Sequence, residues 1–314
     1  MNIAKTVKTK EKEKGLPIKK HNGIISFWKF MFCMMIVVFH LTEKNGGIGI
    51  FSAGRIGVEF FFIVSGYFMT KKALSKEDNC TNIGKETFQY VWKKAISFFD
   101  YMLIAFIISF FVKHWVSTFK KNEIVNSVWN LCFLEMSGIK STAVVGQTWY
   151  ISAMLISMLI LYPLIRRYRK NFTYLIAPLI VIFIGGWISH KYGNITGPTV
   201  WTGLIYKGLL RAIFELAIGS ILYEFSNKIK TINFNKVGKI FLNIIELVGF
   251  SSIFIIINIK DASNKYDFIM ILIISISLAI AFSEKTILYN LSNNKFCYYL
   301  EKLSLPIYLN HIWI

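Results

Sequence analysis

A succession of long apolar runs is the feature that most constrains how this chain can fold. Most runs are long enough to cross a hydrocarbon core of roughly 30 Å at about 1.5 Å of rise per residue. Because lipid offers no partner to backbone N–H and C=O groups, the runs must form helices. The sequence therefore predicts an all-α, polytopic transmembrane helical bundle. Eight runs lie near residues 24–41, 50–70, 95–115, 147–165, 172–190, 202–224, 239–258 and 267–283, and a ninth starts near residue 303.

The distribution of charge predicts how the chain lies in the membrane. The net charge is +19, although only 17% of the residues are charged. Lys residues lie in short segments between the apolar runs, which favours contact with anionic lipid headgroups over nucleic-acid binding. By the positive-inside rule we expect a multi-pass protein of the plasma membrane, with residues 1–21 as a basic cytoplasmic tail. The basic segments are 1–20, 71–94, 166–170 and 227–239.

The connections between the runs are also assigned by length. Segment 125–137 is too short to span easily, and we expect an amphipathic piece on the outer face. Segment 284–302 is expected to be a cytoplasmic connection. Only ten residues follow Ser304, roughly 15 Å of helix, so we expect either that the chain is cut short within its ninth helix or that this last piece is not a full span.

Small side chains inside the runs favour packing over chemistry. The four cysteines form no C-x-x-C pair and no cluster with His, so neither a metal site nor a disulfide framework is expected. Glycines inside the runs permit close approach of helices. These residues are Cys33, Cys80, Cys132 and Cys297, and Gly66, Gly185, Gly186 and Gly219.

Ionisable residues inside the runs are costly and each needs a reason. Arg55 and Glu59 are four residues apart on one helix face. They could form a structural ion pair or order the rim of a polar cavity. Lys207, Arg211 and Glu215 form a stripe at the same spacing, with Arg211 and Glu215 as a second candidate pair. Such a stripe is expected to face a cavity or other protein, not lipid.

Lys29 and His40 are expected to share one face of the first helix. They are eleven residues apart, close to three turns and about 16 Å along the axis. His40 is either an interfacial histidine bonded to a loop or a general base for a hydroxyl. A cation on one side and a base on the other would suit a phosphate-bearing donor and a hydroxyl acceptor. They would equally suit an anion transporter, and spacing alone does not decide.

Four stretches resemble the integral-membrane acyltransferases of acyltransferase family 3. The most specific is "GRIGVEFFFIVSGYFMTKK" at 54–72, and the others are "NGIISFWKFMFCMMIVVFH" at 22–40, "TWYISAMLISMLILYPLI" at 148–165 and "LSLPIYLNH" at 303–311. Ser26 and Lys29 replace the family's Asp and Arg, and Ser97 replaces the second Arg of a basic motif. Lys keeps the charge of Arg but loses its bidentate fork.

The resemblance implies an acyltransferase domain over residues 22–314, with about nine helices seen of an expected ten. It implies transfer of an acyl group, expected to be acetyl, from cytoplasmic acyl-CoA to a hydroxyl of a cell-surface polysaccharide or its precursor. Acyl-CoA is a co-substrate, and no permanently bound cofactor or metal is expected. The alternatives are a transporter or flippase of an anionic or glycan substrate, and a degenerate, inactive family member.

The resemblance and the polar residues together give a set of candidate roles. His40 would act as the base on the acceptor hydroxyl, while Arg55 and Glu59 order the site. The remaining candidates are Lys29, Lys93 and Lys94 for the donor, and Arg211, Trp149 and Tyr150 for the acceptor.

Overall fold

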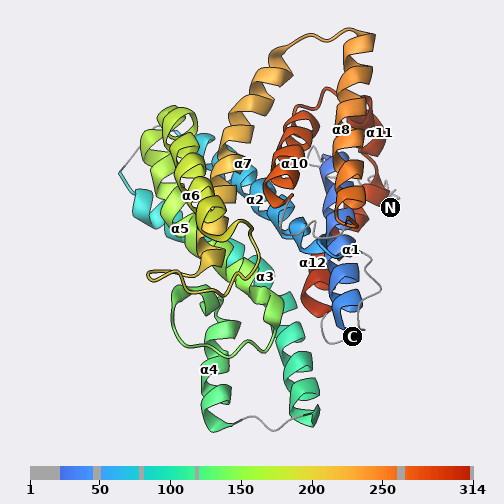
Figure 1. The fold of residues 1–314 in the computed structure, drawn as a ribbon. Helices are drawn as coiled ribbons and strands as arrows, with labels where there is room; N and C mark the ends of the chain where they lie inside the picture. The colour runs from blue at the N-terminus through green and yellow to red at the C-terminus, as the bar shows by residue number, and fades with distance from the viewer. Residues whose placement is uncertain (1–21, 45–50, 78–80, 117–119, 260–265, 312–314) are drawn as a thin grey trace, which may run out of the picture.

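Helices account for nearly all regular structure in the part of the chain that the structure describes (Figure 1). The computed structural model describes residues 22–44, 51–77, 81–116, 120–259 and 266–311. Within these residues the only strand-like pairing is an isolated bridge between Trp201 and Tyr206, so the predicted all-α bundle is confirmed. The long helices are α1 (Gly23–Lys44), α2 (Gly57–Leu74), α3 (Ile83–Val116), α5 (Trp149–Tyr168), α6 (Ala177–Tyr192), α7 (Lys207–Thr231), α8 (Lys236–Ile256), α10 (Asp267–Phe282) and α12 (Lys295–Asn310). The short elements are η1 (Gly54–Ile56), α4 (Lys121–Leu131), η2 (Glu135–Ser137), η3 (Gly146–Thr148), η4 (Phe172–Ile176) and α11 (Ile287–Ser292).

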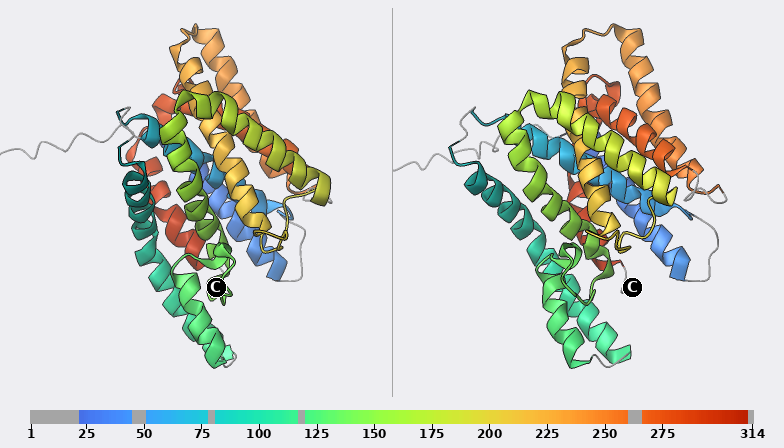
Figure 2. Two further views of the ribbon diagram at one scale, coloured as in Figure 1. Left: turned by 90° about the vertical axis from the view of Figure 1, so that its left-hand side faces the viewer. Right: turned by 60° about the vertical axis from the view of Figure 1, so that its left-hand side comes forward.

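The composition and burial of the helices are those of a membrane protein. Helices α1, α3, α5, α6 and α8 are long and apolar enough to cross a membrane, and α10 is a shorter apolar helix. Helices α2 and α7 carry more ionisable residues, among them Glu59 and Arg211. They lie inside the bundle, where α7 packs against α2, α5, α6 and α10 (Figure 2). Glu59 and Arg211 are buried and therefore face protein and not lipid.

The long helices alternate in direction, so the bundle has two ends. At one, the histidine end, α1 and α12 finish near His40 and His311. At the other, the lysine end, α2 finishes near Lys72 and α3 begins, with Lys93 in its third turn. The α7–α8 hairpin extends furthest at the lysine end, and the α3–α4 hairpin extends furthest at the histidine end (Figures 1 and 2).

Glycines bring α2 and α7 into close contact. A Cβ added to Gly66 would lie 2.2 Å from the backbone oxygen of Leu216, so no larger residue fits without moving a helix. Gly219 meets the backbone of α2 in the same way, and Gly185 lies against a ring of α7. The packing prediction is wrong for Gly186, because nothing lies within 4 Å of a Cβ at that position.

One connection differs from the sequence-based expectation, and another agrees with it. Segment 284–302 was expected to be a connecting loop, but it contains α11 and the first half of α12. Helix α12 begins at Lys295 because the side chain of Asn294 accepts a hydrogen bond from the Cys297 N–H and caps the helix. The amphipathic segment predicted at 125–137 is helix α4 followed by η2, with Ser127 buried and Val125 exposed. The predicted tail, residues 1–21, lies outside the described residues.

Candidate functional site

Two histidines meet at the histidine end. His40, near the end of α1, and His311, which caps the C-terminus of α12, have ring centroids 5.1 Å apart. The His40 side chain is 31% exposed, and its Nδ1 lies 3.7 Å from an oxygen of Glu43. His311 is only 2% exposed. The fold thus pairs an accessible imidazole with a buried one, from segments at opposite ends of the sequence.

The orientation of His311 is fixed by hydrogen bonds around the end of α12. Its Nδ1 lies 2.7 Å from the backbone oxygen of Tyr308. A carbonyl oxygen only accepts hydrogen bonds, so Nδ1 carries the hydrogen and Nε2 is the titrating nitrogen. Gln147 supports this turn, because its side-chain amide donates to the backbone oxygens of Tyr308 at 3.2 Å and Leu309 at 2.8 Å. The Tyr308 hydroxyl donates to the Gln147 backbone oxygen at 3.1 Å.

A buried carboxyl lies close to this support. Glu135 in η2 accepts hydrogen bonds from the Asn130 amide at 2.9 Å and the Thr148 hydroxyl at 2.7 Å. Burial raises the pKa of Glu135 to about 7, although both hydrogen bonds act in the opposite direction. This carboxyl therefore titrates near neutral pH. It ties η2 to the start of α5, where Gln147 and Thr148 lie.

A buried ionic network lies inside the bundle on α2, α7 and α10. The Arg211 guanidinium is ion-paired with Glu59, and its Nε lies 3.9 Å from Glu215. The Arg55 guanidinium donates to both carboxylate oxygens of Asp267 at 2.9 and 3.0 Å. Glu59, Glu215 and Asp267 are at most 1% exposed, so three carboxyl groups meet the two guanidiniums away from solvent.

The network changes the expected pairing of Arg55 and Glu59. The structure gives each a partner on another helix, Asp267 for Arg55 and Arg211 for Glu59. The reason is local: Arg55 lies in the 3-10 turn η1, before α2 begins, so α-helical i, i+4 spacing does not describe its direction. The predicted Arg211–Glu215 pair is present. The stripe faces protein as expected, because Lys207, like Arg211, is 2% exposed.

Aromatic rings connect the ionic network to the histidine end. The Trp149 ring lies 5.1 Å from the Arg211 guanidinium carbon. The neighbouring Tyr150 packs against Phe62 at 4.6 Å and Tyr308 at 5.8 Å between ring centroids. Trp149 and Tyr150, both predicted to bind substrate, therefore lie between the buried charges and the turn that holds His311. Tyr150 is largely buried at 8% exposure.

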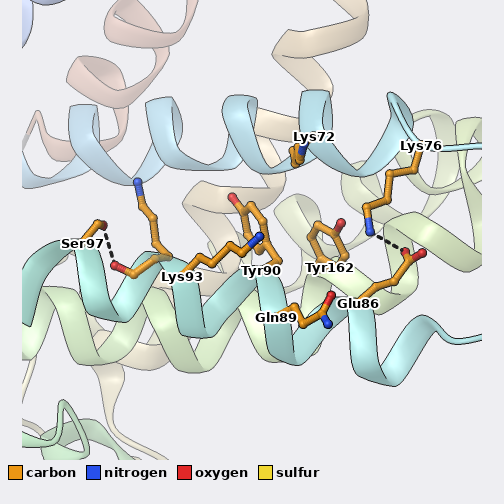
Figure 3. Close-up of a pocket in the computed structure, with 9 residues that line it drawn as sticks. Lys72, Lys76, Glu86, Gln89, Tyr90, Lys93, Ser97 and Tyr162 are labelled. Carbon is orange, nitrogen blue, oxygen red and sulfur yellow. Dashed lines mark hydrogen bonds and ion pairs between the residues drawn. The ribbon is translucent and has the colours of Figure 1, made fainter.

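A basic pocket lies at the lysine end (Figure 3). Its cavity is about 320 Å³, and the stacked rings of Tyr90 and Tyr162, 4.5 Å apart, form part of its wall. Among the residues that the structure describes, the one carboxylate lining it is Glu86, which is paired with Lys76 at 3.2 Å and with the buried Arg166 at 2.9 Å. The pocket is therefore strongly positive. The residues that line it are Lys72, Lys76, Glu86, Gln89, Tyr90, Lys93, Lys94, Ser97 and Tyr162.

Lys29 lies outside the lining of this pocket. Its ammonium is ion-paired with Glu301 on α12, and the same carboxylate accepts a hydrogen bond from the Ser26 hydroxyl at 2.6 Å. Lys29 and His40 share the face of α1 that meets α12, as predicted, because their respective contacts on α12 are Glu301 and His311. The charge of Lys29 is balanced within the protein.

Comparison with known proteins decides the family. A family model described as an acyltransferase domain matches residues 22–314, which covers most of the chain. The chain belongs to acyltransferase family 3. No curated protein and no solved structure matches it. The membrane acyltransferase thus carries a basic pocket at one end of its bundle and a histidine pair at the other.

The fold of this acyltransferase adds several residues that sequence reasoning did not assign. His311 lies in the stretch at 303–311 that resembles the family, but the sequence alone gives it no role. Glu301 lies in the segment predicted to be a connection, where a charge needs no partner. Asp267 stands at the edge of an apolar run, so its partner Arg55 was sought nearer in sequence. The other added residues are Lys72 and Lys76 of the pocket, and Gln147 of the support around His311.

Proposed function

We propose that this acyltransferase moves an acyl group, expected to be acetyl, from acyl-CoA to a hydroxyl of a cell-surface polysaccharide or its precursor. The observation that carries the proposal is the placement of the basic pocket and the histidine pair at opposite ends of one bundle. A donor with several phosphates suits the pocket, and an acceptor hydroxyl needs a base.

The donor would bind with its phosphates in the basic pocket. Lys72, Lys76, Lys93 and Lys94 line it, and the lining carboxylate Glu86 is paired with Lys76 and Arg166. Cations clustered around a cavity of about 320 Å³ are an electrostatic match for the phosphates of CoA. The long pantetheine arm separates the thioester from these phosphates and would extend into the bundle. Lys29, held by Glu301, would lie along this route and not in the phosphate site.

At the histidine end, His40 would take the proton of the acceptor hydroxyl. The oxygen attacks the thioester carbonyl, the new C–O bond forms, and the C–S bond breaks to release CoA as its thiol. Arg55 and Glu59, held by Asp267 and Arg211, would order the region behind the reacting groups. Arg211, Trp149 and Tyr150 would position the acceptor, Trp149 being stacked against Arg211.

The orientation follows from the charge of the two ends. Lys72, Lys76, Lys93 and Lys94 gather at the lysine end, and the positive-inside rule places such an end in the cytoplasm. The pocket would then open toward the compartment that holds acyl-CoA. The enzyme would lie in the plasma membrane with a cytoplasmic N-terminus, and the histidine end would face the acceptor outside.

The test is an assay in inside-out membrane vesicles that contain the full chain. Labelled acetyl-CoA is added at the cytoplasmic face, and the label in polysaccharide is measured for the unaltered protein and for His40→Ala. We expect labelling that His40→Ala abolishes, while His190→Gln, an exposed histidine on α6, leaves it unchanged. Equal labelling by His40→Ala would remove His40 from the reaction. Movement of the substrate across the membrane without transfer of label would indicate a transporter. Absence of both movement and transfer would indicate an inactive family member.

A further inference from the structure

We propose that His311 is a second catalytic residue, which holds the proton that the leaving thiolate of CoA receives. The inference rests on the proposed acyl transfer and adds a residue to it. His311 and His40 have ring centroids 5.1 Å apart, with their planes inclined by 31°. Two imidazoles this close can share one proton between them.

The different exposure of the two rings suggests a different role for each. The His40 side chain is 31% exposed and can meet a hydroxyl that arrives from solvent. His311 is 2% exposed and is closed off from solvent. The acyl donor would reach the pair through the bundle. The buried ring is therefore placed for the sulfur and the exposed ring for the hydroxyl.

The hydrogen bonds of His311 suit a proton donor. Its Nδ1–H donates to the Tyr308 backbone oxygen at 2.7 Å, which stabilises the positive charge of the imidazolium and leaves Nε2 to exchange the proton. Gln147 donates to the same oxygen and to that of Leu309, so the turn is held in place. The ring is thus oriented before any substrate binds.

Other ionisable groups surround the pair and would contribute to its titration. Glu43 on α1 lies 3.7 Å from His40. The Tyr308 hydroxyl, on the last turn of α12, interacts electrostatically with Cys33 on α1, Glu59 on α2, Glu135 on η2 and Tyr150 on α5, and Glu135 does so with Lys113 on α3. A pH profile of the pair therefore reports apparent values for this whole environment.

The reaction balances with the two rings alone. It begins with His40 neutral and His311 protonated. The hydroxyl proton moves to His40 as its oxygen bonds to the carbonyl carbon. The C–S bond breaks, and the thiolate takes the Nε2 proton of His311. Transfer of the proton from His40 to His311 then restores the starting state, with no other co-reactant.

The first experiment compares His311→Gln, His311→Ala, His40→Ala and the double variant in the vesicle assay. A Gln amide can still donate to the Tyr308 oxygen, so a purely structural role predicts an active His311→Gln. We expect instead a loss of roughly 10²–10⁴-fold in kcat/KM for each single variant. Because the rings act as a unit, the double variant should be no worse than a single one. Multiplied losses in the double variant, or a His311→Gln rate within twofold of the unaltered protein, would overturn the proposal.

The pH profile supplies a readout that packing alone does not move. The unaltered enzyme needs His40 neutral and His311 protonated, so kcat/KM should fall at both low and high pH. In His311→Gln the fall of kcat/KM at high pH should disappear. Added imidazole should restore part of the rate of His311→Ala. It should not change the rate of the control His190→Gln, which keeps full activity. An unchanged fall at high pH would contradict the assignment of His311 as the acid.

A measurement without substrate separates this inference from the proposed function. The deuterium exchange of the His40 ring hydrogen, followed by mass spectrometry across pH, gives the pKa of His40. If the rings share a proton, His311→Gln should raise that pKa, because a neighbouring positive charge has been removed. An unchanged pKa would overturn the shared proton. If His311→Gln changes the pKa of His40 but the unaltered protein transfers no acyl group, the shared proton is supported and the proposed function is refuted.

Discussion

The carboxylate of Glu301 on α12 is ion-paired with the ammonium of Lys29 on α1, and it also accepts a hydrogen bond from Ser26. This pair lies on the face that α1 and α12 share with His40 and His311. It joins the two helices that carry the histidines at a point about 16 Å from His40 along α1. The alignment of the histidines therefore depends on a contact far from them.

Removing the charge of Glu301 should weaken this joint. Glu301→Gln leaves the Lys29 ammonium without its counter-charge in a partly buried site, and we expect a loss of about 1–2 kcal/mol in the free energy of unfolding. The measurement is thermal unfolding in detergent micelles. Lys302→Gln, at the exposed next residue, is the matched control and should change stability by less than about 0.5 kcal/mol. Equal effects of the two variants would contradict the role of the ion pair.

The lysines of the basic pocket should act on donor binding and not on the chemical step. Lys93→Gln combined with Lys94→Gln removes two cations that would contact phosphates equally in the ground state and the transition state. We expect KM for acyl-CoA to rise about tenfold while kcat stays within twofold, since uniform binding affects KM alone. Lys71→Gln, outside the pocket lining, is the control. A fall in kcat without a change in KM would place these lysines elsewhere in the reaction.

The glycines offer a paired test of helix contact. Gly66→Ala would put a Cβ 2.2 Å from the backbone oxygen of Leu216, so α2 and α7 must separate at a cost of about 1–3 kcal/mol. Gly186→Ala meets nothing within 4 Å and should stabilise α6 by about 0.5–1 kcal/mol through helix propensity. Unfolding of both variants in micelles checks the opposite signs, and destabilisation by both would refute the contact.

Glu135 should make the stability of the fold depend on pH. Burial raises its pKa to about 7, above the value of the unfolded chain near 4.5. Between these values the folded state binds more protons than the unfolded state, so stability should fall as pH rises from about 4.5 to 7 and then level off. Thermal unfolding from pH 5 to 8 measures this slope. Glu135→Gln should make the slope shallower, whereas Glu77→Gln, at an exposed carboxyl, should leave it unchanged.

Local sequence patterns predicted the helices well, because each apolar run carries its own signal. They also predicted that Lys29 and His40 share a face and that the stripe of Lys207, Arg211 and Glu215 avoids lipid. They did not predict the partners across helices. Spacing along one helix reveals only neighbours within a turn, and the partner of Lys29 lies 272 residues away.

The start of α12 shows a second limit of sequence patterns. The polar residues around 295–302 are typical of a loop. The structure nevertheless begins a helix there, because the Asn294 side chain caps its first turn. The apolar pattern places the start of this helix near residue 303, so Glu301 lies outside the predicted bundle. The partner of Lys29 was therefore missed for a reason of boundaries and not of chemistry.

The ion pair between Arg211 and Glu59 has a consequence for how the protein enters the membrane. A charged residue at the centre of a single inserting helix costs about 2.5–3.5 kcal/mol on insertion scales. Glu59 lies in the first turn of α2 and not at its centre, so α2 bears only part of that cost until Arg211 is synthesised 152 residues later. During translation α2 should therefore wait beside the translocation channel or near its mouth, and leave for the lipid only together with α7.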